Sequence, residues 1–203
     1  MPLAAVATVP TNFCTAFLTL SDKLGLELPW PRSTDFLPQN QHTPILIWGA
    51  ATSVGQFAVQ ILKHWGYTNI IATASSKHHE KIKKHGAKHV LDYQEPNAVD
   101  SILNILNTES PAIPIRAFDC VTSKSGSLQH IAKIATLPGS IVAAVLPVVI
   151  RPPSDKEGVQ LSADVNGEAS WVPGVQVHSV VSYTFEAVCT LFPCPRLVFL
   201  SGS

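Results

Sequence analysis

The 203-residue sequence is poor in charged side chains, which make up 14% of it, against about 25% in an average globular protein. Lys and Arg together number 14, as do Asp and Glu, so the formal net charge is zero. A protein that binds polyanions needs a basic excess on at least one surface. The balance therefore argues against nucleic acid as a partner.

The sequence also lacks paired cysteines, a secretory signal and a membrane-spanning run. Its four cysteines are Cys14, Cys120, Cys189 and Cys194, and none forms the CxxC pattern of a zinc site. The opening MPLAAVATVP has no basic region before its apolar residues. The longest apolar run, residues 141–150, is shorter than the roughly 20 residues that span a bilayer. We expect a soluble, cytoplasmic protein with reduced thiols, no metal site and no membrane contact.

What the sequence does have is a regular alternation of apolar runs and helical stripes. The clearest stripe covers residues 54–65 and ends at Gly66, a residue suited to a helix C-terminus. Asn97 is placed to cap another helix, with Asp100 three residues on. Strands are expected at residues 45–48, 69–74, 89–91, 117–122, 141–146 and, with less pattern behind it, 175–183; helices at 11–24, 54–65, 77–85, 97–106 and 127–135. Continuous apolar strands between helices are typical of an α/β protein with a doubly wound parallel sheet, the Rossmann architecture.

The stretch WGAATSVGQ, residues 48–56, follows the first strand and has the setting of a dinucleotide-binding turn. In the G-x-G-x-x-G register the three special places fall on Ala50, Thr52 and Gly55, with Gly49 just before them. Small residues let the backbone approach a pyrophosphate, which then meets the N–H groups of the helix N-terminus. A tight strand-to-helix turn without a ligand remains the alternative.

The second predicted strand is not followed by the acidic residue that would accept the ribose hydroxyls of NAD. The sequence there is ATASSKHHEK, with Ser75, Lys77 and His78 in the region of interest. Hydroxyls and cations suit a 2′-phosphate, so this pattern favours NADPH over NADH. The alternative is a solvated helix N-terminus, although a lysine there opposes the helix dipole.

Three ordered segments resemble the medium-chain dehydrogenase/reductase superfamily: WGAATSVGQFAVQILKHWGY, IIATASSKHHEKIKKHGAKHVLDYQEP and AFDCVTS. The resemblance covers residues 4–147 and is closest to the zinc-independent quinone and enoyl reductase branch. Within that branch, the fungal trans-acting enoyl reductases of secondary metabolism and the ToxD-like oxidoreductases fit best. The opening AAVATVPTNFCTAFLTL is similar to the helix that precedes the cofactor domain in these proteins.

The resemblance implies a role for several residues. Ser53 and Val54 would offer backbone N–H groups to the pyrophosphate, and Ser75, Lys77 and His78 would hold the 2′-phosphate. Tyr93 would lie against the adenosine end, with a half-buried tyrosine at a strand end as the alternative. Thr15 would approach the nicotinamide, with an ordinary helix residue as the alternative. Leu146 and Pro147 would border the nicotinamide pocket.

The resemblance also implies a division of the chain and a missing part. Residues 1–43 would be a hinge helix and a loop leading in, 44–150 the NADP-binding Rossmann domain, and 151–203 a linker and divergent tail. The GroES-like catalytic domain of the family has no counterpart here, and beyond Ala187 no likeness is found. We therefore expect weak or no turnover from this chain alone, and a wrongly predicted gene boundary or a retained intron would explain the tail.

The expected function is NADPH-dependent hydride transfer to an activated C=C bond, in a small-molecule or carrier-bound enone or enoyl substrate, the carrier being a polyketide synthase acting in trans. No residue is identified as the proton donor. The alternative is a noncatalytic remnant that binds NADPH or a partner subunit. A short-chain reductase is disfavoured, since Tyr183 is not followed by lysine at the required spacing. The lysines of residues 77–88 other than Lys77 are expected to form a solvated helix face, and Cys120 to be inert core.

Overall fold

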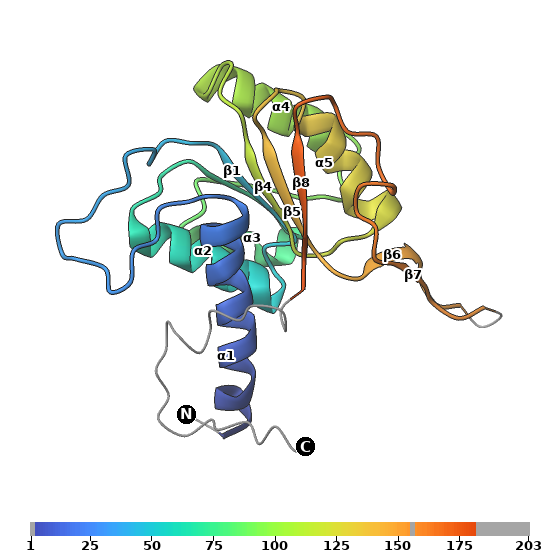
Figure 1. Ribbon diagram of the computed structural model, residues 1–203, viewed down its shortest axis with the longest axis horizontal. Coiled ribbons are helices and arrows are strands. Elements are labelled where there is room, and N and C mark those ends of the chain that lie inside the picture. Colours follow the sequence, from blue (N-terminus) through green and yellow to red (C-terminus); the bar gives the residue numbers. More distant parts are fainter. Residues whose placement is uncertain (1–2, 155–156, 182–203) are drawn as a thin grey trace, which may run out of the picture.

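The protein, described by a computed structural model over residues 3–154 and 157–181, is built on a six-stranded sheet (Figure 1). Its strand order is β3-β2-β1-β4-β5-β8, and every neighbouring pair is parallel. The strands are β1 (Ile45–Trp48), β2 (Ile70–Thr73), β3 (His89–Leu91), β4 (Arg116–Asp119), β5 (Ile141–Val145) and β8 (Gln176–Val180). The doubly wound parallel α/β class predicted from the sequence is confirmed.

Helices cover both faces of this sheet (Figure 1). One face carries α1 (Leu3–Leu18), α2 (Ser53–Trp65) and α3 (His79–His85), and the other carries α4 (Ala98–Glu109) and α5 (Gln129–Ile134). Three short helical turns complete the set: the π-helices η1 (Thr19–Lys23) and η3 (Lys124–Leu128) and the 3₁₀-helix η2 (Ser76–His78). The figure also shows that the N-terminal half of α1 extends beyond the sheet.

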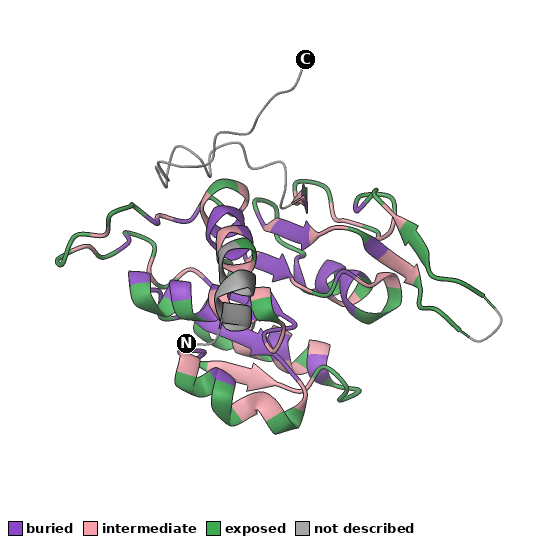
Figure 2. Ribbon diagram, turned by 90° about the horizontal axis from the view of Figure 1, so that it is seen from below, coloured by how far each residue is buried: buried purple, intermediate pink, exposed green. Residues whose placement is uncertain are grey.

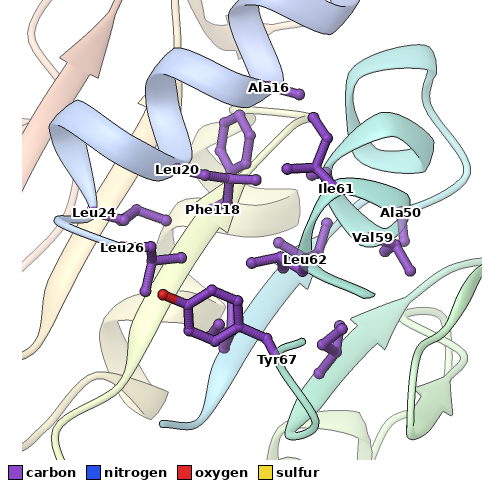
Figure 3. Close-up of a cluster of buried hydrophobic side chains, with 14 of the residues drawn as sticks. Ala16, Leu20, Leu24, Leu26, Ala50, Val59, Ile61, Leu62, Tyr67 and Phe118 are labelled. Carbon is purple, nitrogen blue, oxygen red and sulfur yellow. The ribbon is translucent and has the colours of Figure 1, made fainter. Parts of the chain in front are cut away.

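Successive residues of a strand enter opposite halves of the core, because side chains alternate across a strand. Ile45 and Ile47 face the half covered by α1 and α2, whereas Leu46 and Trp48 face the half covered by α4 and α5. Figure 2 shows the buried strands between helices whose outer surfaces are exposed. In Figure 3, Leu20 of η1 lies against Phe118 of the sheet and close to Ile61 of α2.

The predicted elements agree closely with the observed ones where the apolar pattern was strong. β1 and β3 have the predicted bounds, and β2 and β5 are shorter only at their ends. Helix α2 ends as predicted at Gly66, whose φ of 98° lets its N–H reach the carbonyls of Leu62 and Lys63. The basic segment predicted as one helix is divided into η2 and α3.

Two local predictions were wrong. The fourth strand was expected to reach residue 122, but it ends at Asp119, whose side chain accepts hydrogen bonds from the next loop and turns the chain. Asn97 precedes α4 without capping it by its side chain. Its φ of −99° and ψ of 12° differ from the extended conformation that a capping residue adopts.

The region after β5 forms a hairpin that the sequence did not reveal and a strand that it predicted. Strands β6 (Val148–Arg151) and β7 (Gln160–Ser162) pair antiparallel as a hairpin, and β8 then returns to pair with β5. The sheet therefore takes its last strand from the region assigned to linker and tail. The predicted strand at 175–183 is observed as Gln176–Val180, while the tail beyond Ala187 lies outside the described residues.

Candidate cofactor site

The strand order of the sheet reverses at β1, which pairs with β2 on one side and β4 on the other. In open α/β sheets the crevice outside the carboxyl ends of the strands, at this reversal, is where ligands bind. The two segments that flank it are the turn after β1 and the loop after β4. Both segments border the crevice in which a dinucleotide would bind.

The turn after β1 is held by the neighbouring strand β2. Gly49 donates its N–H to Thr73 Oγ1 at 3.1 Å, and Ala50 donates its N–H to the Thr73 carbonyl at 2.8 Å. Gly49 has a φ of 80°, in the region that glycine adopts without strain. A Cβ at this position would overlap Cγ2 of Val121, so only glycine fits between the two loops.

Gly55 brings α2 against this turn. A Cβ on Gly55 would lie 2.5 Å from the Gly49 carbonyl oxygen and 2.8 Å from Ala50 Cα. These are backbone atoms, which cannot move aside as a side chain can. The small residues predicted at this place therefore serve close packing of the helix on the turn, as in a dinucleotide-binding fold.

Helix α2 begins with two N–H groups that have no acceptor among the described residues. Thr52 is the N-cap, and its hydroxyl accepts the Gly55 N–H at 3.0 Å. The Gln56 N–H is bonded to the Thr52 carbonyl at 2.9 Å. Ser53 and Val54 keep the remaining N–H groups, and the first turn holds no acidic residue. The positive end of the helix dipole is therefore available to an anion.

A second polar cluster lies where β2 ends. Ser75 adopts an extended conformation and its side chain makes no capping bond to η2. Lys77 is exposed and His78 half-buried. Tyr93, which follows β3, has 42% of its surface exposed. The three predicted phosphate-binding residues thus lie together on one short turn, Ser75 as the N-cap of η2 and Lys77 and His78 within it.

Asp92 belongs to this cluster, although it was not among the predicted site residues. Its carboxylate accepts the Ser76 N–H at 2.8 Å and the Gln94 N–H at 3.0 Å. The Gln94 N–H is the first of several groups that lower the pKa of Asp92. The carboxylate therefore serves as an anchor for the turn, and the LDYQEP segment in which we noted Tyr93 contained the signal.

For the residues predicted near the nicotinamide, the structure shows their burial and their hydrogen bonds within the protein. Thr15 is 3% exposed, and its hydroxyl donates to the Thr11 carbonyl of its own helix at 2.8 Å. Leu146 is half-buried and donates its N–H to the Val180 carbonyl at 2.9 Å. Pro147 is exposed and follows a cis peptide bond. Their predicted contacts with the nicotinamide stay predictions.

The loop after β4 brings Asp119, Cys120 and Val121 to the crevice. Burial raises the pKa of the Cys120 thiol well above its usual value, so the thiol is poorly reactive. Val121 is 45% exposed although it is apolar. This segment, AFDCVTS, carries part of the family resemblance, but no function was predicted for Asp119 or Val121.

Other candidate groups give no alternative site. On the basic segment, Lys83 pairs with Glu80 at 3.3 Å, and Lys88 and His89 both contact Glu109 at 2.9 Å. Within residues 3–154 and 157–181, no three His, Cys, Asp or Glu side chains are grouped as metal ligands would be. Over the same residues, no helix is long and apolar enough to cross a membrane.

Comparison with known proteins finds a matching family model and several similar proteins. Residues 53–146 match the family model described as zinc-binding dehydrogenase. The trans-enoyl reductase himH of Aspergillus japonicus is 32% identical over 204 residues, which cover 98% of this chain and 55% of himH. The uncharacterized protein YLR460C of Saccharomyces cerevisiae is 40% identical over 134 residues, 66% of this chain and 33% of that protein.

Among solved structures, the CurK enoyl reductase aligns with a TM-score of 0.61 at 19% identity and covers 95% of this chain and 48% of its own. At that identity the likeness is one of fold. The chain thus spans between about a third and about half of the length of the proteins it matches.

Proposed function

The chain belongs to the medium-chain dehydrogenase/reductase superfamily, whose nicotinamide-cofactor domain it carries, and on this premise we propose that it binds NADPH. The observation that carries the proposal is the pair of unpartnered N–H groups, on Ser53 and Val54, at the start of α2. They follow a glycine turn at the switch point of the sheet, where a pyrophosphate would receive both hydrogen bonds and the helix dipole.

The choice of NADPH over NADH rests on the cluster after β2. Ser75 and Lys77 stand where an NAD-binding domain has a carboxylate for the ribose hydroxyls. The nearby carboxylate of Asp92 is occupied by the Ser76 and Gln94 N–H groups. Lys77 lies in η2, just before α3, where its charge opposes the helix dipole. A 2′-phosphate would remove that conflict by pairing with Lys77 and His78.

For the whole protein we propose an oxidoreductase of the zinc-independent enoyl reductase type. The cofactor supplies a hydride for the β-carbon of an activated enone or enoyl thioester. The residues of this chain bind and orient the dinucleotide: Tyr93 at the adenosine end, and Thr15, Leu146 and Pro147 around the nicotinamide. Positioning and exclusion of water are the main demands of such a transfer.

The relative himH is named a trans-enoyl reductase. For this chain we propose a carrier-bound substrate delivered by a polyketide synthase acting in trans. The part of himH that this chain does not span would then contribute the rest of the substrate pocket. The alternative, a domain that binds NADPH without catalysis, shares the same cofactor site. The two are separated by turnover with enone substrates.

The test is the melting of the 203-residue chain with NADPH, with NADH and without ligand. A ligand at a hundred times its dissociation constant adds roughly 2.7 kcal/mol of stability. We expect a clear rise in melting temperature with NADPH and a small one with NADH. A cooperative melt that neither ligand shifts would overturn the proposal.

Lys77→Ala tests the phosphate site itself. Loss of one charge-assisted hydrogen bond should weaken NADPH binding about tenfold and leave NADH binding unchanged. Lys84→Ala is the matched control, because Lys84 is exposed on the adjacent helix α3. Equal weakening of both cofactors by Lys77→Ala would mean that Lys77 does not read the 2′-phosphate.

A further inference from the structure

Asp119 ends β4 at the centre of the sheet, next to Trp48 of β1 and Ala144 of β5. Its side chain is fully buried. Burial raises the pKa of this carboxyl, while its hydrogen bonds act in the opposite direction. No basic side chain pairs with it among the residues that the structure describes. Burying a carboxylate without a neighbouring cation is unfavourable. The hydrogen bonds that this carboxylate accepts must therefore compensate for its burial.

Among the described residues, the hydrogen bonds to the Asp119 carboxylate come from the loop and the turn that follow it. Oδ1 accepts the Val121 and Thr122 N–H groups, both at 2.9 Å. Oδ2 accepts the Ser127 hydroxyl at 2.6 Å, a length typical of a hydrogen bond to an ionised acceptor. Ser127 in turn accepts the Ser123 N–H at 2.9 Å. One side chain therefore fixes the path of residues 120–123.

This path includes a strained residue. Thr122 has a φ of 50°, which is unfavourable for a β-branched side chain. Its carbonyl accepts the Val149 N–H at 2.8 Å, which ties the loop to β6. The bend directs Val121 outward, against Gly49 of the turn after β1. The loop after β4 and the glycine turn are thus in contact across the crevice.

We propose that Asp119 is a positioning residue, whose buried carboxylate holds Val121 against the glycine turn so that Val121 forms the wall of the cofactor crevice on the β4 side. The inference rests on the proposed NADPH binding. It accounts for an exposed valine beside a turn that only glycine can occupy. It also accounts for a buried acid whose carboxylate accepts hydrogen bonds from the loop and the turn that follow it.

The test is a double-mutant cycle on the dissociation constant for NADPH, with Asp119→Asn, Val121→Ala and the double variant. Val121→Ala should weaken binding about fivefold, by loss of apolar contact. Asp119→Asn should weaken it about tenfold, because the amide cannot accept from all three donors. In the Val121→Ala background the same change should cost less than about threefold, since its effect acts through Val121.

Two controls make the result specific. Val159→Ala makes the same change at a valine with similar exposure in the hairpin loop, and should leave binding unchanged. Ser127→Ala removes a single bond to Asp119 and replaces Asp119→Asn in the cycle should that variant not fold. The melting temperature without ligand is recorded for each variant.

Additive effects of the two substitutions, or an unchanged dissociation constant in the folded Asp119→Asn or Ser127→Ala variant, would overturn this inference and leave the proposed function standing. Absence of NADPH binding by the unsubstituted chain would overturn both.

Discussion

At the scale of single residues, the turn after β1 and the start of α2 each contain a glycine at a position where a side chain would overlap neighbouring atoms. Gly49 faces Val121, and Gly55 faces the backbone of Gly49 and Ala50. The two glycines have different reasons to be there. Gly49 needs its positive φ as well as the space, whereas Gly55 needs only the space. Replacement of Gly55 therefore tests packing without adding backbone strain.

Gly55→Ala should lower the free energy of unfolding by about 1–3 kcal/mol, the usual cost of an added group in a packed interior. Denaturant unfolding of the purified chain measures it. Gly158→Ala is the control, because a Cβ there meets no atom within 4 Å, and it should be neutral or slightly stabilising. Equal stability of the two variants would mean that the turn can relax away from α2.

The sequence located most of these residues but not their partners. Gly49, Ala50, Thr52 and Gly55 were found from their register in the turn, because a dinucleotide site has a local signature. Asp119 has none, since its role depends on where Val121 and Ser127 fall in the folded loop. Asp92 was overlooked for the same reason: its donor, Ser76, belongs to another strand's loop.

At the scale of elements, the start of α2 has to do two things at once. Its cap must stabilise the helix and still leave N–H groups for a ligand. Thr52 meets both needs because its hydroxyl takes the Gly55 N–H and no other of the first turn. The cap is thus separable from the ligand site.

Thr52→Ala should cost about 1 kcal/mol of stability, the usual effect of losing an N-cap side chain. Thermal or denaturant unfolding without ligand measures the change. Thr108→Ala makes the same substitution inside α4, where Thr108 is exposed. There the better helix propensity of alanine should leave stability equal or slightly higher. A neutral Thr52→Ala would show that another group caps the helix.

Helices and strands, like single residues, were predicted where their own sequence determines them and missed where contacts in the folded protein do. β1, β2 and β5 are largely buried apolar runs, and their positions follow from the sequence alone. The end of β4 is set by the acceptor side chain of Asp119, and so the strand was predicted too long. The β6–β7 hairpin was missed because its strands are short and residues 152–158 between them are polar and proline-rich.

At the scale of the whole molecule, the buried acid links folding stability to pH. Burial raises the pKa of Asp119 in the folded protein above the value of about 3.9 expected in an unfolded chain. The folded state therefore binds this proton more tightly. The resulting stabilisation is complete at pH values below the unfolded pKa and is lost as pH rises through the folded one.

Asp119→Asn should remove this dependence. The free energy of unfolding of the unsubstituted chain, minus that of the variant, should fall as pH rises from about 4 and then level off. Urea unfolding of both proteins at a series of pH values measures the difference, in which the contributions of all other groups cancel. A difference that grows with pH would show that the hydrogen bonds, not burial, control the carboxyl.

The reversal of strand order at β1 also has a consequence for how the molecule is made. The two strands that flank the crevice, β1 and β4, are separated along the chain by β2, β3 and their helices. During synthesis β1 and β2 can pair early, while the opposite wall does not yet exist. A nascent chain thus completes both sides of this crevice only after β4 has emerged from the ribosome and docked. Until then, β1 keeps an unpaired edge of the kind at which chains aggregate.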